Sequence, residues 1–358
     1  MERTLDAEVG DQIGKVVPGL SVLVASANET LSDTSFGLSD RAAGVAMASD
    51  TLCNWFSMTK LVTATAAVQL ADRSLLDLDS PVERYYEPFA ALRPTARARK
   101  ASVRHLLSHS SGVANPLPLR WVHLATEQGP DRARFVETLL SKHRRLRFDP
   151  GRKAAYTNLG YLVLGEVISR VAGQPFEEYV RTNVLAPLRM ARTDFVATAG
   201  PNWATPYQRR FTPLSALMPL LILRKIIGSK DDRFVALHHF YVDGAAYGGL
   251  VGPAADAIRF VRAHLRGGEL DGARILSEER CHEMQTIVTR GRRLEVGLGW
   301  FRRGAAPDAD FVEHLGGGAG FWNCMRIYPA RGLGVVTMGN ATSYDHDRVV
   351  RAAVDNAA

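Results

Sequence analysis

The sequence predicts an α+β protein, because strand patterns lie near both ends of the chain and helical patterns fill the middle. Residues 16–26 form an apolar run with β-branched side chains, which is typical of a central strand. We expect residues 34–38 to pair with it. From about residue 113 to 290 the apolar spacing is mostly helical. Near the C-terminus, four short stretches again indicate strands: 297–301, 311–314, 321–328 and 333–338.

The composition is that of an ordinary soluble globular chain. Its 358 residues are 46% hydrophobic and 23% charged, which leaves room for a sizeable core and two lobes. The formal net charge is +7, but arginine is spread along the chain and clusters only at 97–100 and 142–147. Neither cluster is interleaved with aromatic residues, so we interpret both as solvated surfaces and expect no nucleic-acid partner.

The three cysteines predict neither a disulfide framework nor a metal site. Cys53, Cys281 and Cys324 lie far apart, without metal-ligand spacing, and their number is odd. The first residues show no basic segment followed by an apolar one, as a signal peptide would. We therefore expect a cytoplasmic protein without a metal or another cofactor.

The most apolar stretch, residues 211–228, is too short and too interrupted by proline for a membrane-spanning helix. We predict no integral membrane segment. Three interpretations stay open for this stretch: a wall of an acyl pocket, a peripheral contact with a membrane surface, and a segment buried in a helical lobe.

Residues 54–70 carry the clearest catalytic pattern. Ser57 follows an apolar, aromatic lead-in, and Lys60 lies three residues later in an alanine-rich helical pattern. Three residues are close to one helical turn, so both side chains would project from the same face. A lysine whose pKa is lowered can take the proton of a serine hydroxyl. Ser-x-x-Lys also occurs by chance, so the motif by itself decides nothing.

Tyr156 and Asn158 lie two residues apart on a predicted loop before a helix. In an extended backbone their side chains would point the same way. A phenol can pass a proton to a leaving group, and a carboxamide can orient a substrate or the lysine. The alternative is a packed tyrosine beside an asparagine that caps the helix.

A glycine-rich run, residues 314–320, lies between two of the late strands. Glycine in or beside a strand often marks a place where another group approaches the backbone closely. An acyl substrate laid against such a strand would receive hydrogen bonds from its N–H groups. A phosphate loop is a weaker alternative, because this run adjoins strands rather than a helix and lacks the Gly-x-Gly-x-x-Gly spacing.

Taken in order, these motifs resemble those of the serine β-lactamase-like superfamily, which includes class C β-lactamases, D-Ala-D-Ala peptidases and family VIII carboxylesterases. Ser57 to Lys60 resembles its Ser-x-x-Lys motif, Tyr156 to Asn158 its Tyr-x-Asn motif, and His314 to Gly316 its Lys/His-x-Gly motif. The likeness runs from about residue 17 to residue 340. Further stretches support it: 106–112, 187–190 and 248–256.

The resemblance implies a β-lactamase/transpeptidase-like fold with two lobes. One lobe, residues 1–60 and 290–358, would be an antiparallel sheet flanked by helices. The other, residues 61–289, would be a mostly helical insertion, with the active site where the two lobes meet.

The resemblance also implies a role for each motif residue. Ser57 would be the catalytic nucleophile, and Lys60 and Tyr156 would share the role of base, in a division that the sequence leaves open. The backbone N–H groups of Ser57 and Gly317 would form an oxyanion hole. The substrate-binding residues would be Asn158, His314, Gly316 and Gly318.

His314 stands where the antibiotic-resistance enzymes carry lysine. Histidine is mostly neutral at pH 7, so it offers less to a substrate carboxylate. We therefore predict a serine hydrolase for small acyl substrates, first a carboxylesterase or amidase. The alternatives are a β-lactamase or D-Ala-D-Ala carboxypeptidase, and a non-enzymatic relative that recognises penicillin or binds a partner. The sequence leaves the oligomeric state open.

Overall fold

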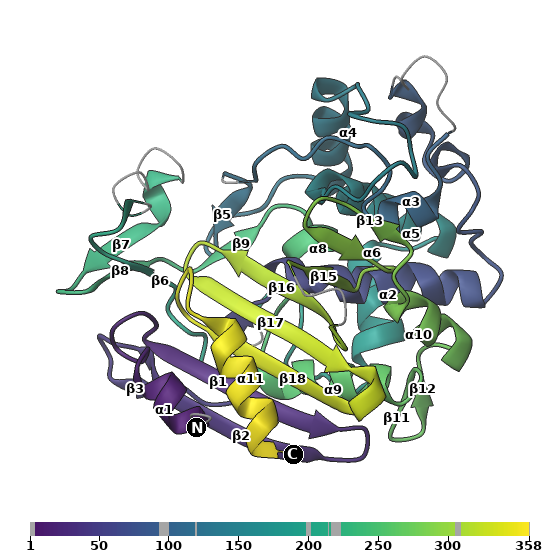
Figure 1. Cartoon of the computed structure of the whole chain (residues 1–358). Coiled ribbons are helices and arrows are strands. Elements are labelled where there is room, and N and C mark those ends of the chain that lie inside the picture. Colours follow the sequence, from purple (N-terminus) through teal and green to yellow (C-terminus); the bar gives the residue numbers. More distant parts are fainter. Residues whose placement is uncertain are drawn as a thin grey trace.

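The computed structural model describes residues 4–92, 100–118, 120–197, 202–213, 215, 223–304 and 309–357. Its main feature is one nine-stranded sheet, paired antiparallel throughout, in the order β13-β14-β15-β16-β17-β18-β1-β2-β3 (Figure 1). The strands are β1 (Gly19–Ser26), β2 (Thr30–Asp40), β3 (Val45–Ala46), β13 (Thr289–Arg290), β14 (Leu294–Val296), β15 (Phe301–Arg303), β16 (Val312–Gly318), β17 (Phe321–Tyr328) and β18 (Leu333–Gly339). The predicted α+β class, with an antiparallel sheet flanked by helices, is confirmed.

Helices lie on both sides of the sheet. They are α1 (Leu5–Gly10), α2 (Thr59–Asp72), α3 (Val103–Leu107), α4 (Arg132–Lys142), α5 (Asn158–Ala172), α6 (Phe176–Val180), α8 (Ala245–Gly248), α9 (Ala254–Leu265), α10 (Glu278–Gln285) and α11 (His346–Ala357). The short strands outside the sheet are β4 (Cys53–Asn54), β5 (Val122–Leu124), β6 (Tyr207–Arg209), β7 (Ile227–Lys230), β8 (Phe234–Leu237), β9 (Phe240–Val242), β10 (Val251–Gly252), β11 (Glu269–Leu270) and β12 (Ala273–Arg274).

The apolar run predicted as a central strand is β1, which pairs with β18 on one side and with β2 on the other. Its side chains are buried on both faces of the sheet. Leu20, Val22 and Val24 pack in the core beneath α1 and α11, whereas Leu23 and Ala25 join the larger core that contains α2, α5 and α9. Helices cover both faces, so the strand is continuously apolar rather than alternating.

Helix α2 begins two residues after Ser57 and runs through the centre of the larger core. All its residues from Thr59 to Ala71 are buried. A helix that is enclosed on every side needs no polar stripe, which explains why this segment is rich in alanine and shows no amphipathic pattern. The helix therefore gives Ser57 and Lys60 a rigid support.

The prediction of a strand at residues 297–301 is wrong for most of that stretch. β14 ends at Val296 and β15 begins at Phe301. Gly299 between them has a φ of 93°, a left-handed conformation that glycine adopts without strain. The chain turns here, so Gly297 to Trp300 form the connection between two strands.

The division into a sheet lobe and an inserted helical lobe stays a prediction. Helix α9 lies within the predicted insertion of residues 61–289, yet it packs on the sheet against β1 and β18. Residues 97–99 of the first basic cluster, and residues 214 and 216–222 of the apolar stretch, lie outside the described residues. Within the described part of the chain, no helix has the length and apolar character needed to cross a membrane.

Candidate active site

Ser57 lies in a tight turn that leads directly into α2. Residues Phe56–Met58 form one 3₁₀ turn, and Phe56 has a φ of 46°. That conformation is unfavourable for a bulky residue and persists only where the surroundings impose it. Here the N–H of the preceding Trp55 donates to the carbonyl of Leu250 at 2.8 Å, and the Trp55 indole donates to the carbonyl of Gly252 at 3.0 Å. The turn is thus held firmly at the start of the helix.

Lys60 is fully buried, with its Nζ 3.0 Å from Ser57 Oγ. The same Nζ donates to the carbonyl oxygen of Tyr247 in α8 at 2.7 Å. No carboxylate in the described part of the chain forms an ion pair with it. Burial lowers the pKa of Lys60 well below its ordinary value. The structure therefore favours the neutral amine next to the serine hydroxyl.

Three tyrosine rings surround the Lys60 amine. Its Nζ lies 4.9 Å from the ring centroid of Tyr156, 5.2 Å from that of Tyr247 and 5.6 Å from that of Tyr161. Burial raises the pKa of Tyr156, although a hydrogen bond with Ser57 acts in the opposite direction. The Tyr156 phenol therefore stays protonated around neutral pH.

Asn158 is the first residue of α5, but it does not cap that helix. The cap is Thr157, whose Oγ1 accepts a hydrogen bond from the N–H of Gly160. Asn158 is buried, and its own N–H donates to Asn115 Oδ1 at 2.9 Å. No hydrogen bond joins its side chain to Ser57 or Lys60, and Asn158 does not line the cavity at Ser57. Its assignment as a substrate-binding residue stays a prediction.

The glycine run forms the end of β16 and packs against the Ser57 turn. A Cβ at Gly316 would lie 2.1 Å from the carbonyl oxygen of Trp55, and one at Gly318 would lie 2.1 Å from the Phe56 ring. The group that approaches this backbone closely is therefore the turn that carries the nucleophile. A group does approach the glycine backbone closely, as expected. That group is part of the protein, whereas the sequence analysis suggested an acyl substrate.

Gly317 lies between those two glycines and lines the cavity with Ser57. β15 pairs with β16 only at Glu313, so beyond Glu313 the described part of the chain places no strand on that side of β16. Backbone groups along this edge are thus available to a substrate. This arrangement fits an oxyanion hole formed by the N–H groups of Ser57 and Gly317.

His314 is fully buried and lies behind the cavity rather than lining it. Its Nδ1–H donates to the carbonyl of Leu315 at 2.9 Å. Burial lowers the pKa of His314 to about 3. The imidazole is therefore neutral at pH 7, and it provides no cation for a substrate carboxylate.

The cavity at Ser57 has a volume of about 460 Å³ and one wall rich in arginine. Arg292, Arg293 and Arg303 line it, and none of them forms an ion pair with a carboxylate in the described part of the chain. No sequence motif marked these residues: Arg292 and Arg293 lie in the turn between β13 and β14, Arg303 ends β15, and these segments meet the catalytic turn only in the fold. The rest of the wall is mostly apolar, with side chains from Ala154, Ala155, Leu294, Phe301, Leu315 and Trp322.

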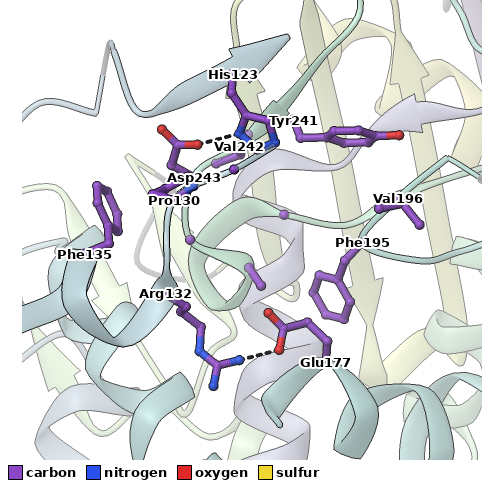
Figure 2. Close-up of a pocket in the computed structure, with 14 residues that line it drawn as sticks. His123, Pro130, Arg132, Phe135, Glu177, Phe195, Val196, Tyr241, Val242 and Asp243 are labelled. Carbon is purple, nitrogen blue, oxygen red and sulfur yellow. Dashed lines mark hydrogen bonds and ion pairs between the residues drawn. The ribbon is translucent and has the colours of Figure 1, made fainter. Parts of the chain in front are cut away.

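A second hollow, of about 190 Å³, lies where α4, α6 and β9 meet (Figure 2). Its charged groups are already paired: His123 with Asp243 at 2.6 Å, and Arg132 with Glu177. Among the described residues, no serine, cysteine or lysine lines it. The cavity at Ser57 is therefore the better candidate for catalysis.

One cluster in the described part of the chain has the residue types of a metal site. Glu313, His346 and Asp347 present ligand atoms to one another. However, the guanidinium of Arg326 donates to Glu313 Oε2 at 2.6 Å and to Asp347 Oδ1 at 2.5 Å. Because a permanent cation already occupies the space between the carboxylates, these residues do not fit a metal ion.

A family model described as Beta-lactamase matches residues 3–358. The chain belongs to the Beta-lactamase family. It is 27% identical over 341 residues to penicillin-binding protein 4 of Amycolatopsis lactamdurans, covering 92% of this chain and 84% of that protein. It is 34% identical over 198 residues to esterase EstB of Burkholderia gladioli, covering 53% of this chain and 50% of the esterase.

The fold comparison agrees with the family assignment. The structure of D-amino acid amidase from Ochrobactrum anthropi in complex with D-phenylalanine superimposes with a TM-score of 0.78 at 22% identity, covering 99% of this chain and 98% of the amidase. The predicted β-lactamase/transpeptidase-like fold is therefore confirmed. Proteins named as a penicillin-binding protein, an esterase and an amidase all resemble this chain, so membership of the Beta-lactamase family does not specify its substrate.

Proposed function

We propose that this protein is a serine hydrolase that cleaves ester or amide bonds of small acyl substrates through an acyl-enzyme at Ser57. The observation that carries the proposal is the distance of 3.0 Å between Ser57 Oγ and the buried Lys60 Nζ, at the wall of a cavity. A nucleophile within hydrogen-bonding reach of a base is what nucleophilic catalysis requires. The family relationship to an esterase and an amidase supports the same reaction class.

Lys60 is the better candidate for the base. Burial lowers its pKa and raises that of Tyr156, so near neutral pH the amine is the group that is ready to accept a proton. The protonated Tyr156 phenol is then suited to donate a proton to the leaving group.

In the proposed reaction, Ser57 Oγ attacks the substrate carbonyl carbon while its proton passes to Lys60. The carbonyl oxygen becomes an oxyanion, which accepts hydrogen bonds from the backbone N–H groups of Ser57 and Gly317. As the bond to the leaving group breaks, Tyr156 protonates that group and regains a proton from Lys60. Water then attacks the acyl-enzyme, and the acid product leaves with Ser57 restored. One oxyanion-hole donor typically contributes about 3 kcal/mol to lowering the barrier.

The leading candidate activity is that of a carboxylesterase. Leu294, Phe301 and Leu315 offer an apolar wall for an acyl chain, and the neutral His314 supplies no charge behind it. Apolar side chains with a few polar groups are usual in sites that bind small organic substrates.

The arginine side of the cavity favours a second candidate, a D-Ala-D-Ala carboxypeptidase or β-lactamase. Arg292, Arg293 and Arg303 can supply the cation that His314 lacks. A guanidinium binds a carboxylate through two parallel hydrogen bonds, so these residues suit a substrate with a free carboxyl group.

The two candidates are separated with matched substrates. p-Nitrophenyl butyrate tests the esterase, and a peptide ending in D-Ala-D-Ala, compared with its C-terminal amide, tests the peptidase. Intact-protein mass spectrometry during turnover should show an acyl adduct, and peptide mapping should place it on Ser57. Turnover should disappear in Ser57→Ala and persist in Ser141→Ala, which changes an exposed serine on α4. Equal turnover by wild type and Ser57→Ala would refute the proposed function.

Other properties of the protein stay predictions. A cytoplasmic location is supported by three buried cysteines without a disulfide, Cys53, Cys281 and Cys324. The predicted partner is a small-molecule acyl substrate, without nucleic acid, metal or cofactor. A peripheral membrane contact through residues 211–228 and the oligomeric state are open to experiment.

A further inference from the structure

His109 lies in the loop after α3, completely buried among the aromatic rings of the active site. Its imidazole packs against Tyr156, with ring centroids 4.4 Å apart, and against Tyr161, with centroids 4.9 Å apart. Its backbone has a φ of 52°, the left-handed region. Histidine and asparagine adopt that region more readily than most other residues do.

Tyr156 lies on a segment that is itself neither helix nor strand. Residues 153–157 belong to neither kind of element, and α5 begins only at Asn158. A side chain that must keep its hydroxyl within reach of Ser57 therefore depends on contacts from elsewhere. A misplacement of 1 Å at such a site can cost about 100-fold in rate.

His109 supplies hydrogen bonds on both sides of Tyr156. The N–H of Ala155 donates to the His109 carbonyl at 2.8 Å, and the N–H of Thr157 donates to His109 Nδ1 at 3.2 Å. Because Nδ1 accepts, the neutral imidazole carries its proton on Nε2. Burial lowers the pKa of His109 well below its ordinary value, so the ring stays neutral and Nδ1 remains an acceptor.

We propose that His109 is a positioning residue that holds the Tyr156 phenol against Ser57. The proposal rests on the proposed function only for the role of Tyr156 as proton donor. His109 fixes Tyr156 by three contacts: a hydrogen bond to the residue before it, a hydrogen bond to the residue after it, and a ring packed at a tilt against its side chain. The two hydrogen bonds hold the backbone on either side of Tyr156, and the imidazole contacts its ring.

Two substitutions separate these contacts. His109→Asn places an amide oxygen near the position of Nδ1 and tolerates the left-handed backbone, so it keeps the acceptor and loses the ring. His109→Phe keeps a ring and loses the acceptor. We expect each variant to lower kcat for p-nitrophenyl butyrate about 10-fold with little change in KM, since misplacement affects the chemical step more than binding.

A double-mutant cycle tests whether His109 acts through the Tyr156 hydroxyl. In a Tyr156→Phe background, His109→Asn should lower kcat less than 2-fold, because the group it positions is gone. Tyr161→Phe is the matched control: that ring also touches His109, but its hydroxyl donates to the carbonyl of Leu107 at 3.0 Å. In the control background the full 10-fold loss should persist. Equal losses in both backgrounds would overturn the proposal.

Amide hydrogen exchange tests the backbone contacts without any turnover. In His109→Phe the Thr157 amide should exchange at least 10-fold faster than in wild type, whereas in His109→Asn it should stay protected. Unchanged exchange in His109→Phe would refute the hydrogen bond, whatever the enzyme does. If turnover were independent of Ser57, the proposed function would fail, yet the exchange experiment would still decide whether His109 holds this segment.

Discussion

Gly316 packs against Trp55 so closely that a Cβ at Gly316 would lie 2.1 Å from the Trp55 carbonyl oxygen. The end of β16 and the turn that carries Ser57 therefore touch backbone to backbone. This contact sets the position of the nucleophile relative to Gly317 and so to the proposed oxyanion hole.

Replacing that glycine should damage both stability and catalysis. Gly316→Ala forces β16 away from Trp55, and overpacking of this kind typically costs about 1–3 kcal/mol of unfolding free energy. Because the same shift separates Ser57 from Gly317, we expect kcat to fall about 100-fold. Gly10→Ala is the control, because a Cβ there would meet nothing within 4 Å. Denaturant melts and ester kinetics measure both effects; a Gly316→Ala variant with wild-type values would show that the contact is unimportant.

Lys60 should determine the pH at which acylation becomes fast. The amine accepts the Ser57 proton only when it is neutral, so the acylation rate should rise with pH and then level off. Because burial lowers the pKa of Lys60, the plateau should begin well below pH 10.5, the ordinary value for lysine. Stopped-flow measurement of the p-nitrophenol burst across pH checks this, and a rate still climbing at pH 10 would contradict it.

Lys60→Arg should strongly reduce this activity, because a guanidinium does not give up its proton near neutral pH. We expect kcat/KM to fall by about 1,000-fold, within the range for loss of a general base. Lys142→Arg, at an exposed position of α4, should behave as wild type. If Lys60→Arg were nearly as active as wild type, Lys60 would not be the base.

Arg303 should discriminate between substrates with and without a free carboxyl group. In Arg303→Gln, the ratio of kcat/KM for a D-Ala-D-Ala peptide to that for its C-terminal amide should fall about 10-fold, the loss expected for one charge-assisted hydrogen bond. Arg209→Gln, at an exposed position of β6, should leave the ratio unchanged. An unchanged ratio in Arg303→Gln would show that Arg303 does not recognise the free carboxyl group of a substrate.

Buried histidines should make the protein less stable in acid. Burial lowers the pKa of both His264 and His314 to about 3, whereas in the unfolded chain each titrates near 6.5. Between those values the unfolded state binds more protons, so unfolding becomes easier as the pH falls from about 6.5 towards 3. Each histidine contributes about 1.4 kcal/mol per pH unit to this loss.

His264→Gln and His314→Gln each isolate one such contribution. In either variant the dependence of unfolding free energy on pH, measured by denaturant melts between pH 6 and 4, should be shallower than in wild type by about 1.4 kcal/mol per pH unit. Ser141→Ala, which removes no titratable group at an exposed position of α4, is the control and should keep the wild-type slope. Wild-type slopes in both test variants would mean that these rings titrate normally in the folded protein.

Local pattern was enough to predict much of this protein. The predicted proximity of Ser57 and Lys60 depends only on the helical period. In the structure Ser57 Oγ and Lys60 Nζ lie 3.0 Å apart. The apolar run at residues 16–26 predicted β1, because a strand that is buried on both faces of a sheet is apolar at consecutive positions. The order of three short motifs predicted the family. Each of these inferences uses residues that are neighbours in the sequence.

Only the tertiary structure decided what surrounds those residues. The carbonyl that holds Lys60 belongs to Tyr247, 187 residues further along the chain. The arginines of the cavity and the hydrogen bonds of His109 likewise come from segments far from the motifs that they meet. The glycine pattern predicted a close approach but not its partner, because a missing side chain indicates space without indicating what fills it. Periodicity determines local geometry, whereas long-range packing decides which groups share a site, and the substrate preference of this protein depends on that packing.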